Sequence, residues 1–377
     1  MSELGNDSGH PTEALRLPKT RLDDLIQLLW DDGYRVLGPI LREGSVAFDD
    51  VHRSADLPVG WRDEQQPGRY RLVPGVPGEV FGVVNGPGSL KAFFFAPEET
   101  LLEIHREKKG FRVQDVLPAP ARLAIIGVRA CDLAALAVQD RIFLHDRIRD
   151  AHYAVRRADV LLVAVSCTRS VSTCFCVSMG TGPEATRGYD IALTELEEVL
   201  VARGASAAGQ GVLERLVLGP SSAEEQAAAG AAIERCAQQM ERRLDTSDLP
   251  ALLYDEVESP RWKEVAERCL SCTNCTMVCP TCFCHAVVDE TVLNGNMSQR
   301  VRRWDSCFSY EHAHVHGKNY RPHIRDRYRQ WLTHKLASWI DQFGTSGCVG
   351  CGRCITWCPV GIDLTEEVAA IRAAAST

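Results

Sequence analysis

The sequence lacks a hydrophobic run long enough to cross a membrane. Its longest apolar run lies near residues 160–165, whereas a membrane helix requires roughly 20 apolar residues. The opening residues contain neither an apolar signal core nor a twin arginine. We therefore expect no membrane contact and a location in the reducing cytoplasm. The charge balance of 42 Lys and Arg against 50 Asp and Glu, net −8, argues against a general nucleic-acid-binding protein.

Sequence motifs of common catalytic sites are also absent. We find no Walker loop, no HExxH helix and no nucleophile elbow. The segment Asn85-Gly-Pro-Gly-Ser-Leu contains glycines, but it lacks a strand–helix frame and predicts a turn. Cysteine, in contrast, is abundant, with 16 in 377 residues. A chain of this length buries its own core without disulfides, so the thiols indicate metal or redox chemistry.

The cysteines divide into two sets, separated by a stretch rich in Ala, Gly, Ser and Glu. The division predicts an α/β domain, a helix with a linker, and an α-helical ferredoxin-like domain, over residues 1–220, 221–250 and 251–377. In the middle part, Ser222 and Glu225 form a capping box that begins a helix. Cys236 lies on the apolar face of that helix, which indicates a packed core thiol rather than a ligand.

Two runs in the C-terminal third share the spacing Cys-x-x-Cys-x-x-Cys-x-x-x-Cys-Pro. In bacterial ferredoxins the first three cysteines of such a run hold one 4Fe–4S cluster and the fourth ligates the other cluster. The spacing therefore predicts two clusters. One uses Cys269, Cys272, Cys275 and Cys358, and the other uses Cys348, Cys351, Cys354 and Cys279. A pair of zinc sites is the alternative, although these usually combine two CxxC knuckles.

Helical patterns surround both runs. Ser259-Pro260 begins a helix that leads to Cys269, and an apolar face from Ile324 to Phe343 marks a long helix that ends at Gly344. A short terminal helix begins near Asp363. We expect packed helices, rather than a hairpin, to bring the two runs together.

The N-terminal set of cysteines falls next to predicted strands. Residues 122–128 and 159–165 are buried-strand patterns, and residues 133–143 between them form a helix, which makes a βαβ unit. Open α/β sheets bind ligands at the carboxyl ends of their strands. The residues expected at that edge are Cys131, Cys167, Cys174 and Cys176. They predict a third 4Fe–4S cluster; packed thiols are the alternative.

Cys282, Cys284 and Cys307 remain without an assigned role. One interpretation is a cluster site in which these three cysteines are ligands and His285 or a water is the fourth. The other is a group of thiols that lies beside the clusters. The segment 300–335 contains nine Lys or Arg. This positive charge has three interpretations: a solvated helix face, compensation of negatively charged clusters, or a docking face for an acidic partner.

Several segments together resemble the β subunits of cytoplasmic sulfhydrogenases, which are NADP-coupled bidirectional nickel–iron hydrogenases. A weaker likeness is to the A subunit of anaerobic sulfite reductase. The segments are GVRACDLAAL (127–136), SCTRSVSTCFCVSMGTGP (166–183), CLSCTNCTMVCPTCFC (269–284), RRWDSCF (302–308), RYRQWLTHKLASWIDQFG (327–344) and CVGCGRCITWCPVGID (348–363). The resemblance implies a subunit that passes electrons between the large and small hydrogenase subunits and a flavin subunit that handles NADP.

The sequence thus favours an electron-transfer subunit with two or three 4Fe–4S clusters that catalyses nothing alone. An electron-input subunit of an anaerobic sulfite or sulfur reductase is the alternative within the same class. A redox- or oxygen-sensing cluster protein is the alternative from another class, but it would carry an effector domain, such as a DNA-reading helix pair, that we do not find. A structural protein stabilised by zinc sites is a further alternative, and such a protein would be colourless.

Overall fold

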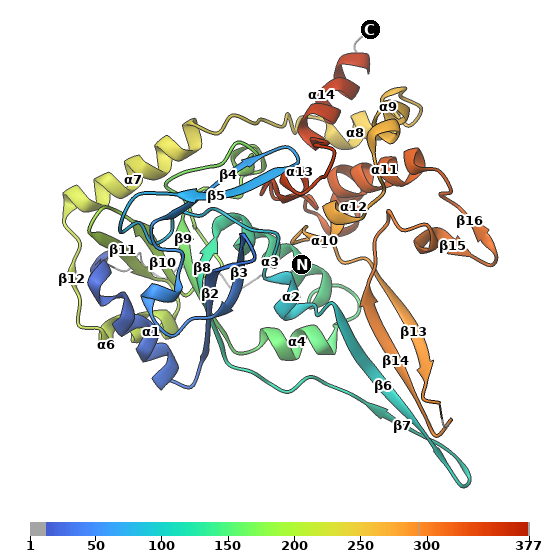
Figure 1. Cartoon of the computed structure of the whole chain (residues 1–377), viewed down its shortest axis with the longest axis horizontal. Helices are drawn as coiled ribbons and strands as arrows, with labels where there is room; N and C mark the ends of the chain where they lie inside the picture. Colours follow the sequence, from blue (N-terminus) through green and yellow to red (C-terminus); the bar gives the residue numbers. More distant parts are fainter. Residues whose placement is uncertain (1–12, 294, 376–377) are drawn as a thin grey trace.

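The computed structural model describes residues 13–293 and 295–375. Residues 1–12 of the predicted first domain therefore lie outside the described residues. They include most of the N-terminal segment in which we find no export signal. The fold is mixed α/β, with a large sheet on one side, a protruding smaller sheet, and the helices of the C-terminal third gathered above it (Figure 1). Within the described ranges, no helix is long and apolar enough to cross a membrane.

The large sheet has eight strands in the order β12-β1-β11-β10-β9-β8-β2-β3. Its centre is parallel, from β2 to β10, and its outer strands pair antiparallel. The bounds are β1 (Leu15–Pro18), β2 (Arg35–Arg42), β3 (Ser45–Asp50), β8 (Leu123–Arg129), β9 (Val160–Ser166), β10 (Ile191–Glu195), β11 (Val199–Gly204) and β12 (Gly219–Pro220). Every residue of β8 is buried, as expected for a parallel strand covered on both faces.

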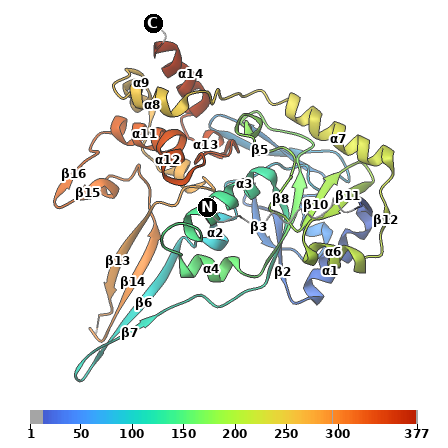
Figure 2. The same cartoon turned by 180° about the vertical axis from the view of Figure 1, so that it is seen from behind.

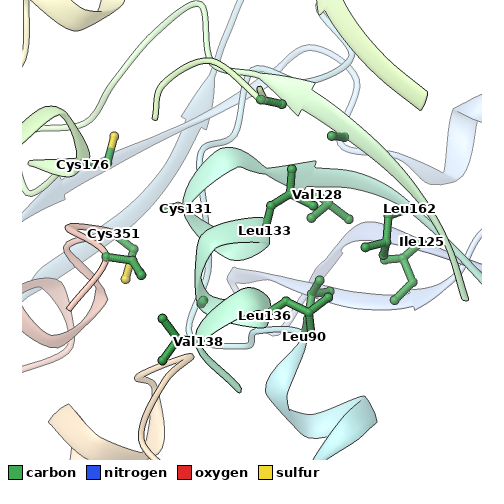
Figure 3. Close-up of a cluster of buried hydrophobic side chains, with 14 of the residues drawn as sticks. Leu90, Ile125, Val128, Cys131, Leu133, Leu136, Val138, Leu162, Cys176 and Cys351 are labelled. Atoms are coloured by element: carbon green, nitrogen blue, oxygen red, sulfur yellow. The ribbon is translucent and has the colours of Figure 1, made fainter. Parts of the chain in front are cut away.

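Helices cover the two faces of this sheet. Side chains of α3, including Leu133 and Leu136, pack on one face against Ile125, Val128 and Leu162 (Figure 3). The α1 side chains pack on the other face. The N-terminal helices are α1 (Leu22–Asp31), α2 (Lys91–Phe94), α3 (Ala130–Phe143), α4 (Ala151–Arg157), α5 (Cys176–Met179), α6 (Ala207–Arg215) and α7 (Ala223–Gln238). The predicted βαβ unit is thus confirmed, and Ser222 forms the expected capping box before α7.

The smaller sheet joins the two halves of the chain and extends away from the body (Figures 1 and 2). Its order is β13-β14-β6-β7, and all three pairings are antiparallel. The bounds are β6 (Glu98–Glu107), β7 (Gly110–Asp115), β13 (His285–Thr291) and β14 (Met297–Trp304). Because β6 precedes residue 220 and β14 follows residue 251, this sheet crosses the predicted domain boundary.

The C-terminal third combines this hairpin with several helices. They are α8 (Leu249–Asp255), α9 (Arg261–Arg268), α10 (Asn274–Met277), α11 (Ile324–Thr333), α12 (Trp339–Phe343), α13 (Arg353–Thr356) and α14 (Leu364–Ala375), with a π-helical segment, His334–Ser338, between α11 and α12. The long helix ends at Gly344, which adopts a left-handed conformation (φ 67°), as predicted. The two cysteine runs are therefore connected through a hairpin as well as through helices, whereas the sequence predicts helices alone.

Two short antiparallel pairs complete the fold. The pair β4–β5 lies beside α13, near the end of the second cysteine run, and the pair β15–β16 precedes α11 (Figure 1). The bounds are β4 (Trp61–Gln66), β5 (Arg69–Pro74), β15 (His314–Val315) and β16 (Lys318–Asn319).

Candidate iron–sulfur sites

The first cavity lined by cysteines, which we call site A, contains Cys269, Cys272, Cys275 and Cys358. Helix α9 ends directly before Cys269, and the second run supplies Cys358. Backbone N–H groups of Ser271 and Ile362 donate to the sulfurs of Cys269 and Cys358 at 3.4 and 3.3 Å. Apolar side chains, among them Phe308, Tyr328 and Trp331, close the remaining wall. The structure thus brings together the four cysteines that the spacing predicts for one cluster.

The second cavity, site B, contains Cys348, Cys351, Cys354 and Cys279. This grouping is the second set that the spacing predicts. Cys354 also lines site A, so the two cavities are neighbours.

Several thiols of the two sites are buried, whereas Cys272 of site A is exposed. Burial raises the pKa of the Cys275 and Cys354 thiols well above their usual value and that of Cys348 to about 12. A buried thiolate is costly unless a positive charge compensates it. Iron would supply that charge, so these thiols fit a metal cluster better than an empty apolar core.

Cys279 differs from the other cysteines of site B. A hydrogen bond from Cys282 and the charge of Lys335 hold the pKa of its thiol well below the usual value, although burial acts in the opposite direction. Lys335 Nζ lies 3.3 Å from the Cys279 sulfur and 3.5 Å from the Cys282 sulfur. This corner of site B therefore places a buried lysine beside two cysteine sulfurs.

In the part of the chain that the structure describes, no three Cys, His, Asp or Glu side chains converge closely enough to hold a single metal ion. The fit of sites A and B to metal clusters therefore rests on which cysteines line each cavity and on the burial of their thiols.

The four N-terminal cysteines, which we call site C, also come together. Cys131 lies in the first turn of α3, and Cys167 directly follows β9. Cys174 lies on the next loop, and Cys176 is the first residue of α5. The Cys176 thiol interacts electrostatically with Cys174 and Cys167, and that of Cys131 with Cys176. Burial raises the pKa of Cys174 to about 12. The four cysteines therefore lie near the carboxyl ends of β8 and β9, at the edge of the sheet that the sequence predicts.

Cys351 of site B interacts with thiols of site C. Electrostatic interactions connect it with Cys131, Cys174 and Cys176, and Figure 3 shows Cys176 and Cys351 beside the end of α3 that carries Cys131. Sites A, B and C are therefore successive neighbours.

Cys236 is fully buried on α7, in agreement with the sequence. Its thiol nevertheless interacts with that of Cys167, which the sequence does not indicate. Helical spacing shows which face of α7 is buried, but it does not show what that face covers. Cys236 is thus a core thiol at the border of site C.

The loops of sites B and C are directly bonded to each other. The N–H of Phe175 donates to Gly350 O at 2.9 Å, and the Thr181 hydroxyl donates to Val349 O at 2.7 Å. A buried ion pair joins Arg353 of α13 to Asp132 of α3, with 2.9 Å between nitrogen and oxygen. The two halves of the chain therefore position each other's cysteines.

Most cations of the basic stretch have local acidic partners. Arg300 bonds Asp289, and Arg303 bonds Glu98. Lys335 instead bonds the sulfurs at site B. Charge compensation near the thiolates is thus seen at Lys335, whereas ion pairing occupies the arginines of β14.

Comparisons with known proteins agree with this geometry. A protein-family model described as a 4Fe-4S dicluster domain matches residues 268–362. The chain is 30% identical over 341 residues to the Sulfhydrogenase 2 subunit beta of Pyrococcus furiosus, and the match covers 90% of this chain and 92% of the relative. No solved structure matches. The chain therefore belongs to the sulfhydrogenase β-subunit family and carries a 4Fe–4S dicluster domain in its C-terminal third.

Proposed function

We propose that this chain is an iron–sulfur electron-transfer subunit of an oxidoreductase complex and has no catalytic site of its own. One observation carries the proposal: the first three cysteines of each run line one cavity together with the fourth cysteine of the other run, and Cys354 borders both cavities. This exchange of the fourth ligand is the arrangement of two-cluster ferredoxins. We assign these eight cysteines as ligands of two 4Fe–4S clusters, and the four of site C as ligands of a third.

The three sites form a route through the molecule. When bound, each cluster supplies a one-electron carrier. Cys354 lines both A and B, and Cys351 interacts with the thiols of C, so the order is A, B, C. The chain's own residues exclude water through the apolar walls, donate N–H groups to the sulfurs, and place Lys335 beside B.

The family supports a choice of partner subunits for this chain. The name of the Pyrococcus relative describes a β subunit of a sulfhydrogenase. We propose that this chain connects a hydrogenase module of large and small subunits with a flavin subunit that handles NADP. Electron input to an anaerobic sulfite or sulfur reductase is the second candidate, because the same route would serve another catalytic module.

Iron and sulfide analysis of anaerobically purified protein tests the clusters. We expect about twelve irons per chain for three clusters, whereas about eight would leave only two. Zinc in place of iron would contradict the proposal.

Cysteine variants separate the sites. Cys272→Ser should remove the spectroscopic signal of site A, and Cys174→Ser should remove about four irons while the signals of A and B remain. Cys236→Ser, a buried thiol outside the proposed ligand set, should retain its iron. An unchanged iron content in Cys174→Ser would exclude the third cluster.

Purification from the native cells tests the complex. A tagged chain isolated under anaerobic conditions should recover hydrogenase and flavin subunits. Recovery of a sulfite or sulfur reductase would favour the second candidate, and a chain that recovers no oxidoreductase subunit would contradict both.

A further inference from the structure

A group of donors outside sites A, B and C lies at the base of the hairpin β13–β14. Cys284 directly precedes β13, and Asp305 directly follows β14. The N–H of Asp305 donates to Cys284 O at 2.9 Å, which closes the base of the hairpin. The chain then turns, so that the Cys307 sulfur and the His312 ring both come within hydrogen-bonding range of the Cys284 sulfur.

Asp305 fixes the orientation of the His312 ring. Its Oδ2 lies 2.6 Å from His312 Nδ1, and the N–H of Ser306 donates to its Oδ1 at 2.7 Å. With Nδ1–H donated to the carboxylate, Nε2 is the ring nitrogen that remains for a metal. Histidines that bind metals almost always have such a carboxylate, carbonyl or water partner, which fixes the tautomer and increases the basicity of the ring.

We propose that Cys284, Cys307 and His312 bind a thiophilic transition metal, iron or zinc, with Asp305 as the positioning residue. Two thiolates and an imidazole are the donor types that these metals prefer. Cys282, whose thiol interacts with Cys284, is the nearest candidate for a fourth donor. The structure therefore places a histidine beside the cysteines that the sequence leaves without a role. This histidine is His312 and not His285, the candidate that the sequence suggests. The ring of His285 instead packs against Phe95, with 5.9 Å between ring centroids.

In the described residues the donors touch pairwise and do not yet surround one point. Metal binding thus requires a rotation of these side chains and the release of the remaining thiol protons to solvent. None of Cys284, Cys307 and His312 is assigned to sites A to C, so either proposal can fail without the other.

Metal analysis of the anaerobically purified full chain tests the site. His312→Ala and Cys307→Ser should each lose about one metal ion per chain, iron or zinc, and keep the remaining irons. The signals of sites A and B should persist in both variants, which shows that the chain has folded. His314→Ala, an exposed histidine two residues away, is the matched control and should keep the full metal content.

Two further variants distinguish ligation from a structural role. His312→Cys should restore the metal because it supplies another soft donor, and Asp305→Asn should increase metal loss to a chelator by about 10- to 100-fold. Full metal content in both His312→Ala and Cys307→Ser would overturn the proposal.

Discussion

Lys335 is a buried cation whose partners are mainly sulfur and oxygen atoms around site B. Besides the Cys279 and Cys282 sulfurs, its Nζ donates to Gly347 O at 3.1 Å. Burial alone would lower its pKa, but electrostatic interaction with Cys279 and then Cys282 raises it well above its usual value. Lys335 therefore stays charged. A positive charge and a hydrogen bond at a ligand sulfur favour the reduced cluster, which carries one more negative charge.

We predict that Lys335→Met lowers the midpoint potential of the site B cluster. The expected shift is on the order of 60 mV, equivalent to a tenfold change in the one-electron equilibrium. Lys335→Arg keeps the charge and should shift the potential less. An EPR-monitored redox titration of both variants measures the effect. Equal potentials in Lys335→Met and the wild type would show that the lysine only fills space.

At this scale the sequence predicts the proposed ligands better than the residues around them. A fixed spacing identifies the eight cysteines of sites A and B because a tight loop imposes it. Lys335 follows no such rule, since it contacts a sulfur 56 positions away. Its sequence context shows only a long helix within a basic stretch. His312 is hidden for the same reason, because the pairing of β13 with β14 brings it to Cys284.

At the scale of elements, two glycines allow the second cysteine run to lie directly on the loop before α5. Gly350 and Gly352 have φ values of 64° and 75°. A Cβ on Gly352 would lie 2.3 Å from Thr173 O, and one on Gly350 would lie 2.6 Å from the Cα of Cys176. Both close approaches are to backbone, so a side chain can be accommodated only if the loops separate.

We predict that Gly352→Ala lowers the free energy of unfolding by about 2 kcal/mol or more, from the left-handed backbone and the steric overlap together. The matched control is Gly211→Ala in α6, where an added Cβ meets nothing within 4 Å. That substitution should stabilise the helix by about 0.5–1 kcal/mol. Anaerobic thermal unfolding compares the two variants. Equal melting temperatures would contradict the proposed contact.

The sequence predicts the local elements well and the distant pairings poorly. The strands 122–128 and 159–165 lie within one residue of β8 and β9, because continuous apolar runs are typical of buried parallel strands. The β13–β14 hairpin gives a weak hydrophobic signal, since no residue of β13 is buried and most are exposed. It is ordered by pairing with β6, almost 200 residues earlier, and a local pattern does not contain that information.

At the scale of the whole molecule, the N- and C-terminal parts are joined at several places. Among them are the contact between the loops of sites B and C and the pairing of β6 with β14. Within this pairing, Glu99 is buried among cations: it accepts from Arg302 Nε at 3.0 Å and from Arg156 Nη1 at 2.5 Å, and it contacts His152 Nδ1 at 2.9 Å. Its neighbour Glu98 pairs with Arg303 at the surface.

We predict that Glu99→Gln destabilises the whole chain, whereas Glu98→Gln does not. The Glu99 side chain is 5% exposed and that of Arg302 is 6% exposed, so the loss of the Glu99 charge leaves Asp150 as the one carboxylate that still pairs with Arg302 among the described residues. The expected cost is therefore below that of a buried charge left without any partner, about 3–5 kcal/mol, but above that of an exposed pair. The Glu98 side chain is 61% exposed, and an exposed pair contributes at most about 1 kcal/mol. Urea unfolding under anaerobic conditions measures both, and equal midpoints would show that the junction does not depend on this charge.

The same pair of variants gives an expected pH dependence. Burial alone would raise the pKa of Glu99, but the hydrogen bonds and charges of Arg302 and Arg156 lower it below its usual value of 4.5. A lowered pKa stabilises the folded state at pH values above that of the unfolded group, and this stabilisation is lost as the pH falls through the folded-state pKa. The wild type and Glu98→Gln should therefore lose stability more steeply below about pH 4.5 than Glu99→Gln, which has no carboxylate to protonate there. Parallel stability curves for all three proteins would show that Glu99 does not titrate against the β14 arginines.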